Sequence, residues 1–327
     1  MTRAVLSAIS SLFSRVRGAF ASLFRGKRER APIRPALTPY ELRAAREIIE
    51  WRDKKAGAVL SKLQLIDRPV QWIYETAVPE ALVTRIAAAV NGFLAMLRDA
   101  SYWTYSDKDI LRAASRAGLR VSSADDLARC DLGELDSLAL AYFTANKVIA
   151  ALQGAGCGIG GLAFAAADLP ALFTISLRAI QQIGACYGMA VRSPAMTPVI
   201  LNILNASATY DTAIRQRAFR DTGGPLPELR EHAAVSRIIE RIQSGALEGI
   251  VLQNIQRIPG ELARNIAQKK LVQFIPLVSA GIGAGFNYWF MSNTLQSSYM
   301  IFRKLYLERK YPGVDIEREA VLSSTAP

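Results

Sequence analysis

The sequence has very little of what metal and nucleophile chemistry needs. It holds one histidine, His232, in 327 residues, and three widely spaced cysteines, Cys130, Cys157 and Cys186. No two cysteines form a C-x-x-C pair, so soft ligands are too few for a zinc or iron site, and a disulfide framework is not expected. A G-x-S-x-G elbow is absent, and His232 lies in a polar stretch typical of a solvated helix start. We therefore predict no catalytic residue, no metal site and no cofactor.

Strand patterns are missing too. No run of four to eight residues alternates strictly between apolar and polar side chains, which is the pattern of a half-buried strand. Helical periodicity is common instead, and one helix start is strongly marked, with Thr38 as N-cap, Pro39 in the first position and Glu41 completing a capping box. Further helical periodicity covers 79–100, 107–118 and 131–152. The sequence predicts an all-α, multi-helix bundle.

Acidic residues are scarce near the N-terminus. Residues 1–30 hold seven lysines and arginines against Glu29 alone, which is half of the net charge of +12. Large apolar residues recur there at three- and four-residue steps, which predicts a basic amphipathic helix over 1–27. Polar residues interrupt every turn, so neither a secretory signal nor a membrane span fits, whereas the surface of an anionic bilayer does. The predicted membrane-binding residues are Arg3, Leu6, Ile9, Phe13, Arg17, Phe20, Phe24 and Arg25.

Two other interpretations of this segment stay open. Its apolar stripe would also suit a helix packed on the protein's own core, and an Arg- and Ser-rich, acid-poor segment also fits a mitochondrial presequence. Nucleic acid is not an expected partner, because no nucleic-acid-binding motif is present and the cations are interleaved with a continuous Phe-Leu stripe. Anionic lipid accounts for both the cations and the stripe.

The stretch GAGCGIGG, residues 154–161, contains the G-x-G-x-x-G spacing of dinucleotide-binding loops. Such a loop must follow a strand and be followed about 20 residues later by an acid that binds the ribose. Here the preceding residues have a helical pattern, Asp168 is too close and Asp211 is too far. We predict instead that these small residues admit a neighbouring helix at the entry to an apolar hairpin.

Two segments, 148–167 and 271–302, carry no charge. Each is long enough to cross about 30 Å of hydrocarbon as a helix. The second has cations on both sides, so the positive-inside rule assigns no orientation, and a central helix of a bundle explains the same composition. A buried core or monotopic hairpin and a true membrane span both remain open. A second glycine cluster, 281–285, predicts close packing between the two segments.

Three polar residues, Asp168, Arg178 and Asn287, belong to these apolar surroundings. Asp168 precedes Leu169 and Pro170, which fits an N-cap with proline just inside the helix. Alternatively, Asp168 and Arg178 face an apolar cavity and bind a lipid head group, with Asn287 as a third polar group. Ten residues along one helix are about 15 Å, so Asp168 and Arg178 would not pair directly.

The block GAGCGIGGLAFAAADLPALFTISLRAIQQIGACYG, residues 154–188, and the later IPLVSAGIGAGFN, residues 275–287, resemble the EcsC protein family. The shared pattern is a glycine-rich apolar stretch, then D-L-P, then a helix that carries Arg and ends in Tyr-Gly. The resemblance covers about residues 45–310. Because the family is named for a component encoded beside an ABC transporter, the resemblance implies membrane association and a transporter as an alternative partner. It supplies no catalytic residues.

We expect four regions: a membrane-binding helix (1–27), a linker (28–37), an EcsC-like helical domain (38–312) and a flexible tail (313–327). The expected function is that of a membrane-associated, non-catalytic lipid-binding or membrane-accessory protein on the cytoplasmic face of a membrane. Its expected partners are anionic lipids. The alternatives are an integral accessory component of a transporter and a lipid-acting enzyme.

Overall fold

A computed structural model describes residues 37–54, 84, 88–92, 105–157, 161–193, 196–209, 212–222, 262, 266 and 279–324. Side chains at 156, 157, 161–168, 279–286 and 324 are outside this description. No strand occurs in the described residues, so the all-α prediction is confirmed. The helices are α2 (Pro39–Asp53), α5 (Asp107–Arg116), α6 (Ala124–Leu127), α7 (Leu132–Cys157), α8 (Gly161–Cys186), α9 (Thr197–Ser207), α10 (Thr212–Asp221), α13 (Ser279–Lys310) and α14 (Ile316–Ser324).

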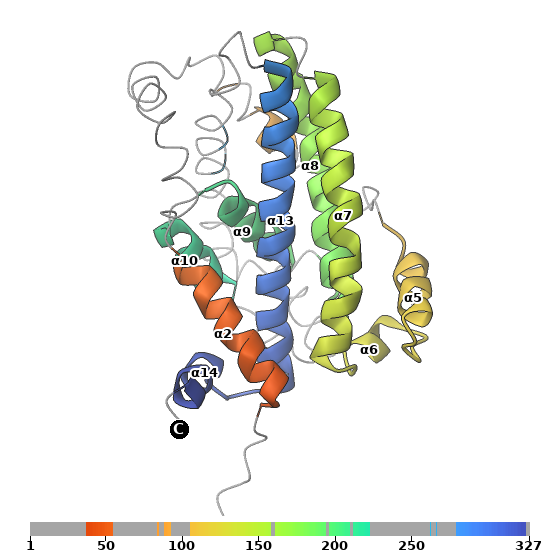
Figure 1. Cartoon of the computed structure of the whole chain (residues 1–327), viewed down its shortest axis with the longest axis vertical. Coiled ribbons are helices and arrows are strands. Elements are labelled where there is room, and N and C mark those ends of the chain that lie inside the picture. The colour runs from red at the N-terminus through yellow and green to blue at the C-terminus, as the bar shows by residue number, and fades with distance from the viewer. Residues whose placement is uncertain are drawn as a thin grey trace, which may run out of the picture. The chain divides into compact units, whose positions relative to one another are not determined.

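Helix α13 is the centre of the bundle. It runs beside α7 and α8, and it also contacts α9 and α2 (Figure 1). Every residue from Ser297 to Leu307 on α13 is buried. A helix enclosed on several sides needs apolar or small residues around most of its circumference. The two charged residues of the buried stretch, Arg303 and Lys304, are both paired.

Helices α7 and α8 form an antiparallel pair against α13 (Figure 1). The GAGCGIGG stretch joins them: residues 154–157 end α7, and Gly161 begins α8. A helix, not a strand, therefore precedes the glycines. The immediate surroundings of these glycines and of the second cluster, 281–285, fall outside the described side chains.

Helix α2 begins as the sequence predicts. The Thr38 hydroxyl accepts a hydrogen bond from the Glu41 backbone N–H at 3.2 Å, and the Glu41 carboxylate accepts one from the Thr38 N–H at 2.8 Å. These two bonds satisfy backbone donors that the first turn of a helix leaves without partners. The capping box is confirmed.

Two local predictions are corrected by the structure. Helix α8 already begins at Gly161 and contains Pro170, so Asp168 lies inside the helix and is not its N-cap. The Ala-rich run before Asp168 favours helix strongly enough to continue through a proline, which removes one backbone hydrogen bond. The predicted flexible tail, 313–327, contains helix α14, which packs on α2.

Close packing at the end of α8 depends on a glycine. A Cβ at Gly184 would overlap Val191 and lie 2.7 Å from the ring of Phe302 on α13. Gly184 therefore lets α8 approach α13 where a larger residue would separate them. After α8, Gly188 has a φ of 62°, a left-handed conformation that glycine adopts without strain. The Tyr-Gly that ends the motif thus ends the helix as well.

Candidate functional site

Charged and tyrosine side chains from four elements meet inside the lower part of the bundle. We call this group the Asp136 cluster, after its central residue. Helix α7 supplies the aspartate, and the other helices surround it. The members are Tyr40 and Glu47 on α2, Asp136 on α7, Tyr187 directly after α8, and Tyr299 and Arg303 on α13.

Asp136 is 1% exposed, and both of its carboxylate oxygens are occupied. Oδ1 accepts a hydrogen bond from the Tyr187 hydroxyl at 2.6 Å, and Oδ2 accepts one from the Tyr40 hydroxyl at 2.7 Å. The guanidinium of Arg303 lies 3.0 Å from Oδ2 through Nη2. A buried carboxylate is stable only with such partners, so Asp136 ties α2, α13 and the end of α8 to α7.

Arg303 is 2% exposed and has partners on several sides. Its Nη1 lies 2.8 Å from Oε2 of Glu47, whose side chain is half exposed. Its guanidinium also lies over the ring of Tyr299, 4.6 Å from the centroid. Ion pairing and cation–π contact together compensate for taking this charge out of water. The network therefore extends from the buried Asp136 to the surface at Glu47.

Burial raises the pKa of the Asp136 carboxyl, and Arg303 and the tyrosine hydroxyls oppose that rise. Burial and the contact with Asp136 raise the pKa of Tyr187 well above its usual value, and they raise that of Tyr40 to about 12. The two tyrosines thus keep their protons and act as donors near neutral pH. With Asp136 and Arg303 almost completely buried, this pair holds the helices together.

A second set of contacts joins the end of α13 to the start of α2. The buried Glu41 accepts hydrogen bonds from Lys310 Nζ at 2.8 Å and from the Tyr311 hydroxyl at 2.7 Å. Burial would raise the pKa of Glu41, but the bonds from Lys310, Tyr311 and Thr38 outweigh it and lower that pKa. The capping residue of α2 is therefore also a tertiary anchor.

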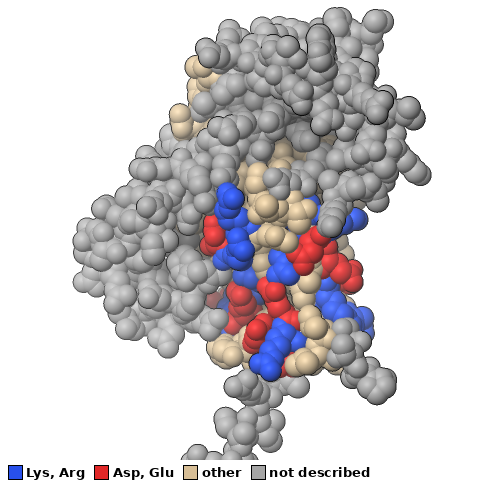
Figure 2. All heavy atoms as spheres, turned by 90° about the vertical axis from the view of Figure 1, so that its left-hand side faces the viewer, with Lys and Arg blue, Asp and Glu red and all other residues tan. Residues whose placement is uncertain are grey.

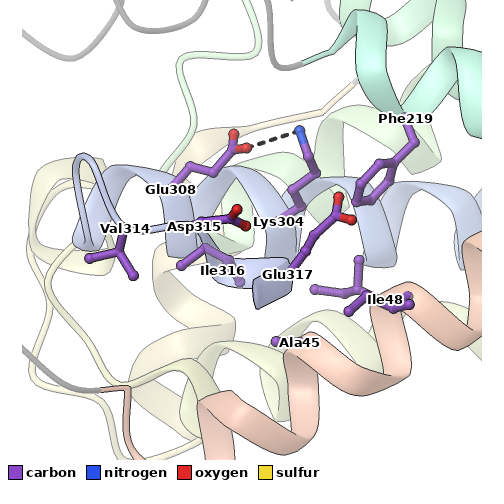
Figure 3. A pocket seen from close by; sticks show the side chains of 10 residues that line it. Ala45, Ile48, Phe219, Lys304, Glu308, Val314, Asp315, Ile316 and Glu317 are labelled. Carbon is purple, nitrogen blue, oxygen red and sulfur yellow. Dashed lines mark ion pairs between the residues drawn. The ribbon is translucent and has the colours of Figure 1, made fainter. Parts of the chain in front are cut away.

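A small cavity of about 130 Å³ lies between α2, α10, α13 and α14 (Figure 3). It is lined by Ala45, Ile48, Ile49, Phe219, Lys304, Glu308, Val314, Asp315, Ile316 and Glu317. Lys304 Nζ lies 3.1 Å from Glu308 and 4.8 Å from the ring centroid of Phe219. Asp315 accepts the Arg318 N–H, and Glu317 pairs with Arg52. The polar groups of this cavity are thus bound to one another or to neighbouring helices.

The surface around this cavity carries both signs of charge. Figure 2 shows lysine and arginine side chains interspersed with aspartate and glutamate over the side of the molecule formed by α2, α10 and α14. Arg52 pairs with Glu317, and Lys310 pairs with Glu41. A surface that binds the phosphate backbone of a nucleic acid would instead carry lysine and arginine side chains without interspersed acids. Charged residues of this face therefore pair with one another.

At the opposite end of the bundle, the ends of α7 and α13 are free of charge, whereas α8 carries Asp168 seven residues after its start at Gly161. Helix α7 has no charged residue from Val148 to its end at Cys157, and α13 has none from its start at Ser279 to Phe302. Apolar side chains face outward here: Leu152 is 69% exposed, Val148 50% and Tyr288 48%. Among the described helices, α7 is long and apolar enough to cross a membrane over Leu132–Ala155, judged by length and composition. Most of that stretch is not buried within the protein.

One charged side chain lies at the border of this apolar end. Lys147 on α7 sits with its ammonium 5.5 Å from the ring centroid of Phe143 and 5.9 Å from that of Tyr288 on α13. The two rings come from different helices, α7 and α13. Cation–π contact holds the ammonium at this level.

Two of the three cysteines, Cys130 and Cys186, lie among the described side chains. Cys186 is fully buried, and burial raises the pKa of its thiol, which keeps it protonated. Cys130 and Cys186 are both free thiols. In the part of the chain that the structure describes, no three histidine, cysteine, aspartate or glutamate side chains come together as ligands for a metal ion.

Comparison with known proteins identifies the family. The model of the EcsC protein family matches residues 43–307, which is most of the chain. The chain belongs to the EcsC protein family. It is similar to the uncharacterized protein YdbA of Bacillus subtilis strain 168, with 22% identity over 277 residues, 84% of this chain and 95% of that protein. No solved structure matches it.

The Asp136 cluster lies largely within the EcsC match. Glu47, Asp136, Tyr187 and Arg303 all fall between residues 43 and 307. The contacts of Glu41 with Lys310 and Tyr311 lie outside that range. The part of the chain that matches the EcsC family therefore contains its own buried ion pair, and the anchor at the start of α2 adds to it.

The predicted site residues are distributed differently from the expectation of one cavity. The membrane-binding residues Arg3 to Arg25 lie outside the described residues, as does the side chain of Asp168. Arg178 is exposed on α8, whereas Asn287 is fully buried on α13. Arg178 and Asn287 therefore do not share an enclosed cavity, and the cavity of Figure 3 is lined by other residues.

Sequence reasoning missed the Asp136 cluster. A signal was present, because Asp136 falls on the same helical face as Leu132, Leu135 and Ala139, all of which are buried. A charge on an otherwise apolar face of an EcsC helix indicates a buried polar partner. The partner itself, Arg303, is 167 positions away, and no local pattern connects the two.

Proposed function

We propose that this protein is a membrane-associated, non-catalytic lipid-binding protein of the EcsC family that rests on the cytoplasmic face of a membrane. The end of the bundle at which α7 and α13 lack charge would enter the lipid, and the basic segment 1–27 would hold the protein to anionic head groups. The observation that carries the proposal is the division of charge along α7 and α13. Ion pairs occupy one end, and outward-facing apolar side chains occupy the other.

The exposed apolar side chains favour lipid over water. Val148, Leu152 and Tyr288 lie on two neighbouring helices, with no charged residue beyond Lys147 on α7 to interrupt them. Moving a large apolar side chain out of water stabilises it by about 1.5 to 3 kcal/mol when burial is complete. A continuous apolar surface of this kind marks a site of contact with a membrane or a partner protein. Free cysteines are compatible with a reducing compartment.

The segment 1–27 supplies the electrostatic part of the proposal. Its cations and its Phe-Leu stripe match an amphipathic helix lying in the plane of an anionic membrane surface. Each cation near such a surface contributes about 1 kcal/mol. Two modest attachments acting together give firm binding, because the second acts at high effective concentration once the first is made.

An integral component of a transporter is the second candidate, and the length and composition of α7 favour it. A spanning α7 would carry Lys147 within the hydrocarbon and bring Asp136 close to the far interface. Charges inside a bilayer are costly, and Asp136 is already committed to Arg303 in the bundle. Alkaline carbonate extraction separates the two candidates, since only a spanning protein stays with the membrane pellet.

Vesicle flotation tests the proposed function. The full chain, a chain starting at Thr38, and a full chain with Arg3, Arg17 and Arg25 changed to Gln are floated with neutral and with anionic phosphatidylglycerol vesicles. We expect the full chain to float with anionic vesicles. We expect the other two proteins to float less with anionic vesicles. We expect their flotation with neutral vesicles to be no higher.

The outcomes separate the parts of the proposal. Equal flotation of the full chain and the chain from Thr38 would exclude a role for segment 1–27. Failure of the full chain to float with either vesicle would overturn membrane association altogether. An unchanged requirement for anionic lipid after the three Arg→Gln changes would show that the cations lie elsewhere.

A further inference from the structure

We infer that Lys147, Phe143 and Tyr288 form a collar at the level of the lipid head groups, where Lys147 binds phospholipid phosphate. The parts of α7 and α13 beyond this collar enter a single leaflet, together with the first turns of α8, in which Asp168 is the one charged residue. This inference rests on the proposed membrane association and adds its depth, its direction and a specific lipid contact. The collar is defined by one cation and two rings from two helices.

The composition of the collar suits a membrane interface. Lysine keeps its ammonium among head groups while its methylene stem lies along apolar surface, and aromatic rings are enriched at the same level. Lys147 is half buried, and its ammonium is held between Phe143 and Tyr288. Tyr288 is 48% exposed, so the collar faces outward. A phosphate is the anion that a cation at this level meets in a phospholipid surface.

The lengths of the helices beyond the collar match one leaflet. Helices α7 and α13 run antiparallel, because Arg303 meets Asp136 at one end and Tyr288 meets Lys147 further along. From Lys147 to its end at Cys157, α7 extends about 15 Å. From Tyr288 back to Ser279, where the described part of the helix begins, α13 extends about 14 Å. Half of a hydrocarbon core of about 30 Å is about 15 Å, so α7 ends near the middle of the bilayer.

Two exposed leucines on α7 distinguish this orientation from others. Leu152 lies beyond the collar, and Leu140, which is 47% exposed, lies on the side of Asp136. End-on insertion places Leu152 in hydrocarbon and leaves Leu140 in water. A helix that spans the membrane gives both leucines a lipid environment, whereas a helix that lies flat holds its axis at the same depth beneath both.

The test uses nitroxide labels in the full chain with vesicles of phosphatidylcholine and phosphatidylglycerol. Cys130, Cys157 and Cys186 are replaced by Ala, and a single cysteine is introduced as Leu140→Cys, Val148→Cys or Leu152→Cys. Relaxation by oxygen and by a water-soluble nickel chelate reports the depth of each label. We expect the label at 152 to be reached by oxygen and not by nickel, the label at 140 to be reached by nickel, and the label at 148 to lie between them.

Charge reversal tests the phosphate contact. Lys147→Glu should weaken binding to anionic vesicles about tenfold, because a cation near the surface is replaced by a repelled anion. Lys108→Glu is the matched control: it makes the same change at an exposed site on α5, and we expect no loss of binding. Lys147→Gln should give a smaller loss, and the helical circular dichroism of each variant shows that the fold is kept.

The results separate this inference from the proposed function. If the full chain binds vesicles but the label at 152 stays accessible to nickel, or Lys147→Glu binds like Lys108→Glu, the collar is wrong and the basic segment alone accounts for binding. Lipid environments at both 140 and 152 would overturn the single-leaflet orientation. If the full chain does not bind vesicles, the proposed function itself fails.

Discussion

The two ends of α7 and α13 belong to the same helices yet use their surfaces in opposite ways. At one end, Asp136 and Arg303 are buried, paired and surrounded by tyrosines. At the other end, Leu152 and Tyr288 face outward, and charge is missing beyond Lys147 on α7. Buried ion pairs therefore lie at one end of these helices, and exposed apolar side chains lie at the other. Substitutions at the two ends should separate these properties.

The largest effect should come from breaking the buried ion pair. Asp136→Ala leaves Arg303 buried without its main counter-charge and removes the acceptor of Tyr187 and Tyr40. Removing one partner of a buried pair costs about 3 to 5 kcal/mol. We expect the free energy of unfolding, measured in urea, to fall by that amount.

The control for Asp136→Ala is Asp109→Ala, which breaks an exposed pair with Arg112 on α5. Exposed ion pairs contribute about 0 to 1 kcal/mol, so this variant should remain close to the parent. If both variants lose the same small free energy, Asp136 is not the centre of stability that its burial indicates.

The contrast between the ends was only partly predictable. Local signals were sufficient for the start of α2, because Thr38, Pro39 and Glu41 set a capping box within four residues. Local signals misplaced the start of α8. Asp168 and Pro170 fit the start of a helix, but they also fit a helix interior when an Ala-rich stretch precedes them. The charge-free ends were visible directly in the sequence. Their meeting at one end of the bundle follows from the antiparallel packing of α7 and α13.

Long-range partners were beyond prediction. Glu317 on α14 pairs with Arg52 on α2, 265 positions earlier. This contact ties α14 to α2, although the sequence predicted a flexible tail over 313–327. Asp136 and Arg303 each look unusual on an apolar face, but their pairing depends on how α7 and α13 pack. Gly184 gave no signal of its own, since the need for glycine comes from the approach of Phe302.

Glu41→Gln tests the polar end through the pH dependence of the free energy of unfolding. The hydrogen bonds from Lys310, Tyr311 and Thr38 lower the pKa of Glu41 in the folded protein, so its contribution is present above the unfolded pKa of about 4.3 and is lost as the pH falls. Hydrogen bonds to a charged group are worth about 1.5 to 3 kcal/mol, which sets the expected loss at pH 7. Below pH 4, the difference between Glu41→Gln and the parent should shrink.

Urea unfolding from pH 3 to pH 7 measures this difference. The same substitution at the exposed Glu319 on α14 serves as the control and should leave the pH profile of stability unchanged. A constant difference between parent and Glu41→Gln at every pH would mean that packing, and not charge, accounts for the role of Glu41.

Gly184→Ala tests the close contact between α8 and α13. The added Cβ would meet Phe302 and Val191, so the helices must separate or side chains must shift. Overpacking of this kind costs about 1 to 3 kcal/mol in the free energy of unfolding. Gly92→Ala adds the same methyl group to a helical residue with no heavy atom within 4 Å, and it should leave stability unchanged or raise it by up to about 1 kcal/mol. A matching loss in both variants would place the cause outside the α8–α13 contact.

The smallest effect on stability is expected at the apolar end. Leu152→Ala shortens a side chain that is 69% exposed, so the free energy of unfolding should change by no more than about 0.5 kcal/mol. Leu138→Ala makes the same change on α7 at a buried position, where it should cost about 2 to 5 kcal/mol. Flotation with anionic vesicles should show the reverse order, with Leu152→Ala binding more weakly and Leu138→Ala binding like the parent at temperatures where it is folded. If Leu152→Ala destabilises the protein as much as Leu138→Ala does, this end is held in the fold like the other, and a division between a stabilising end and a binding end does not exist.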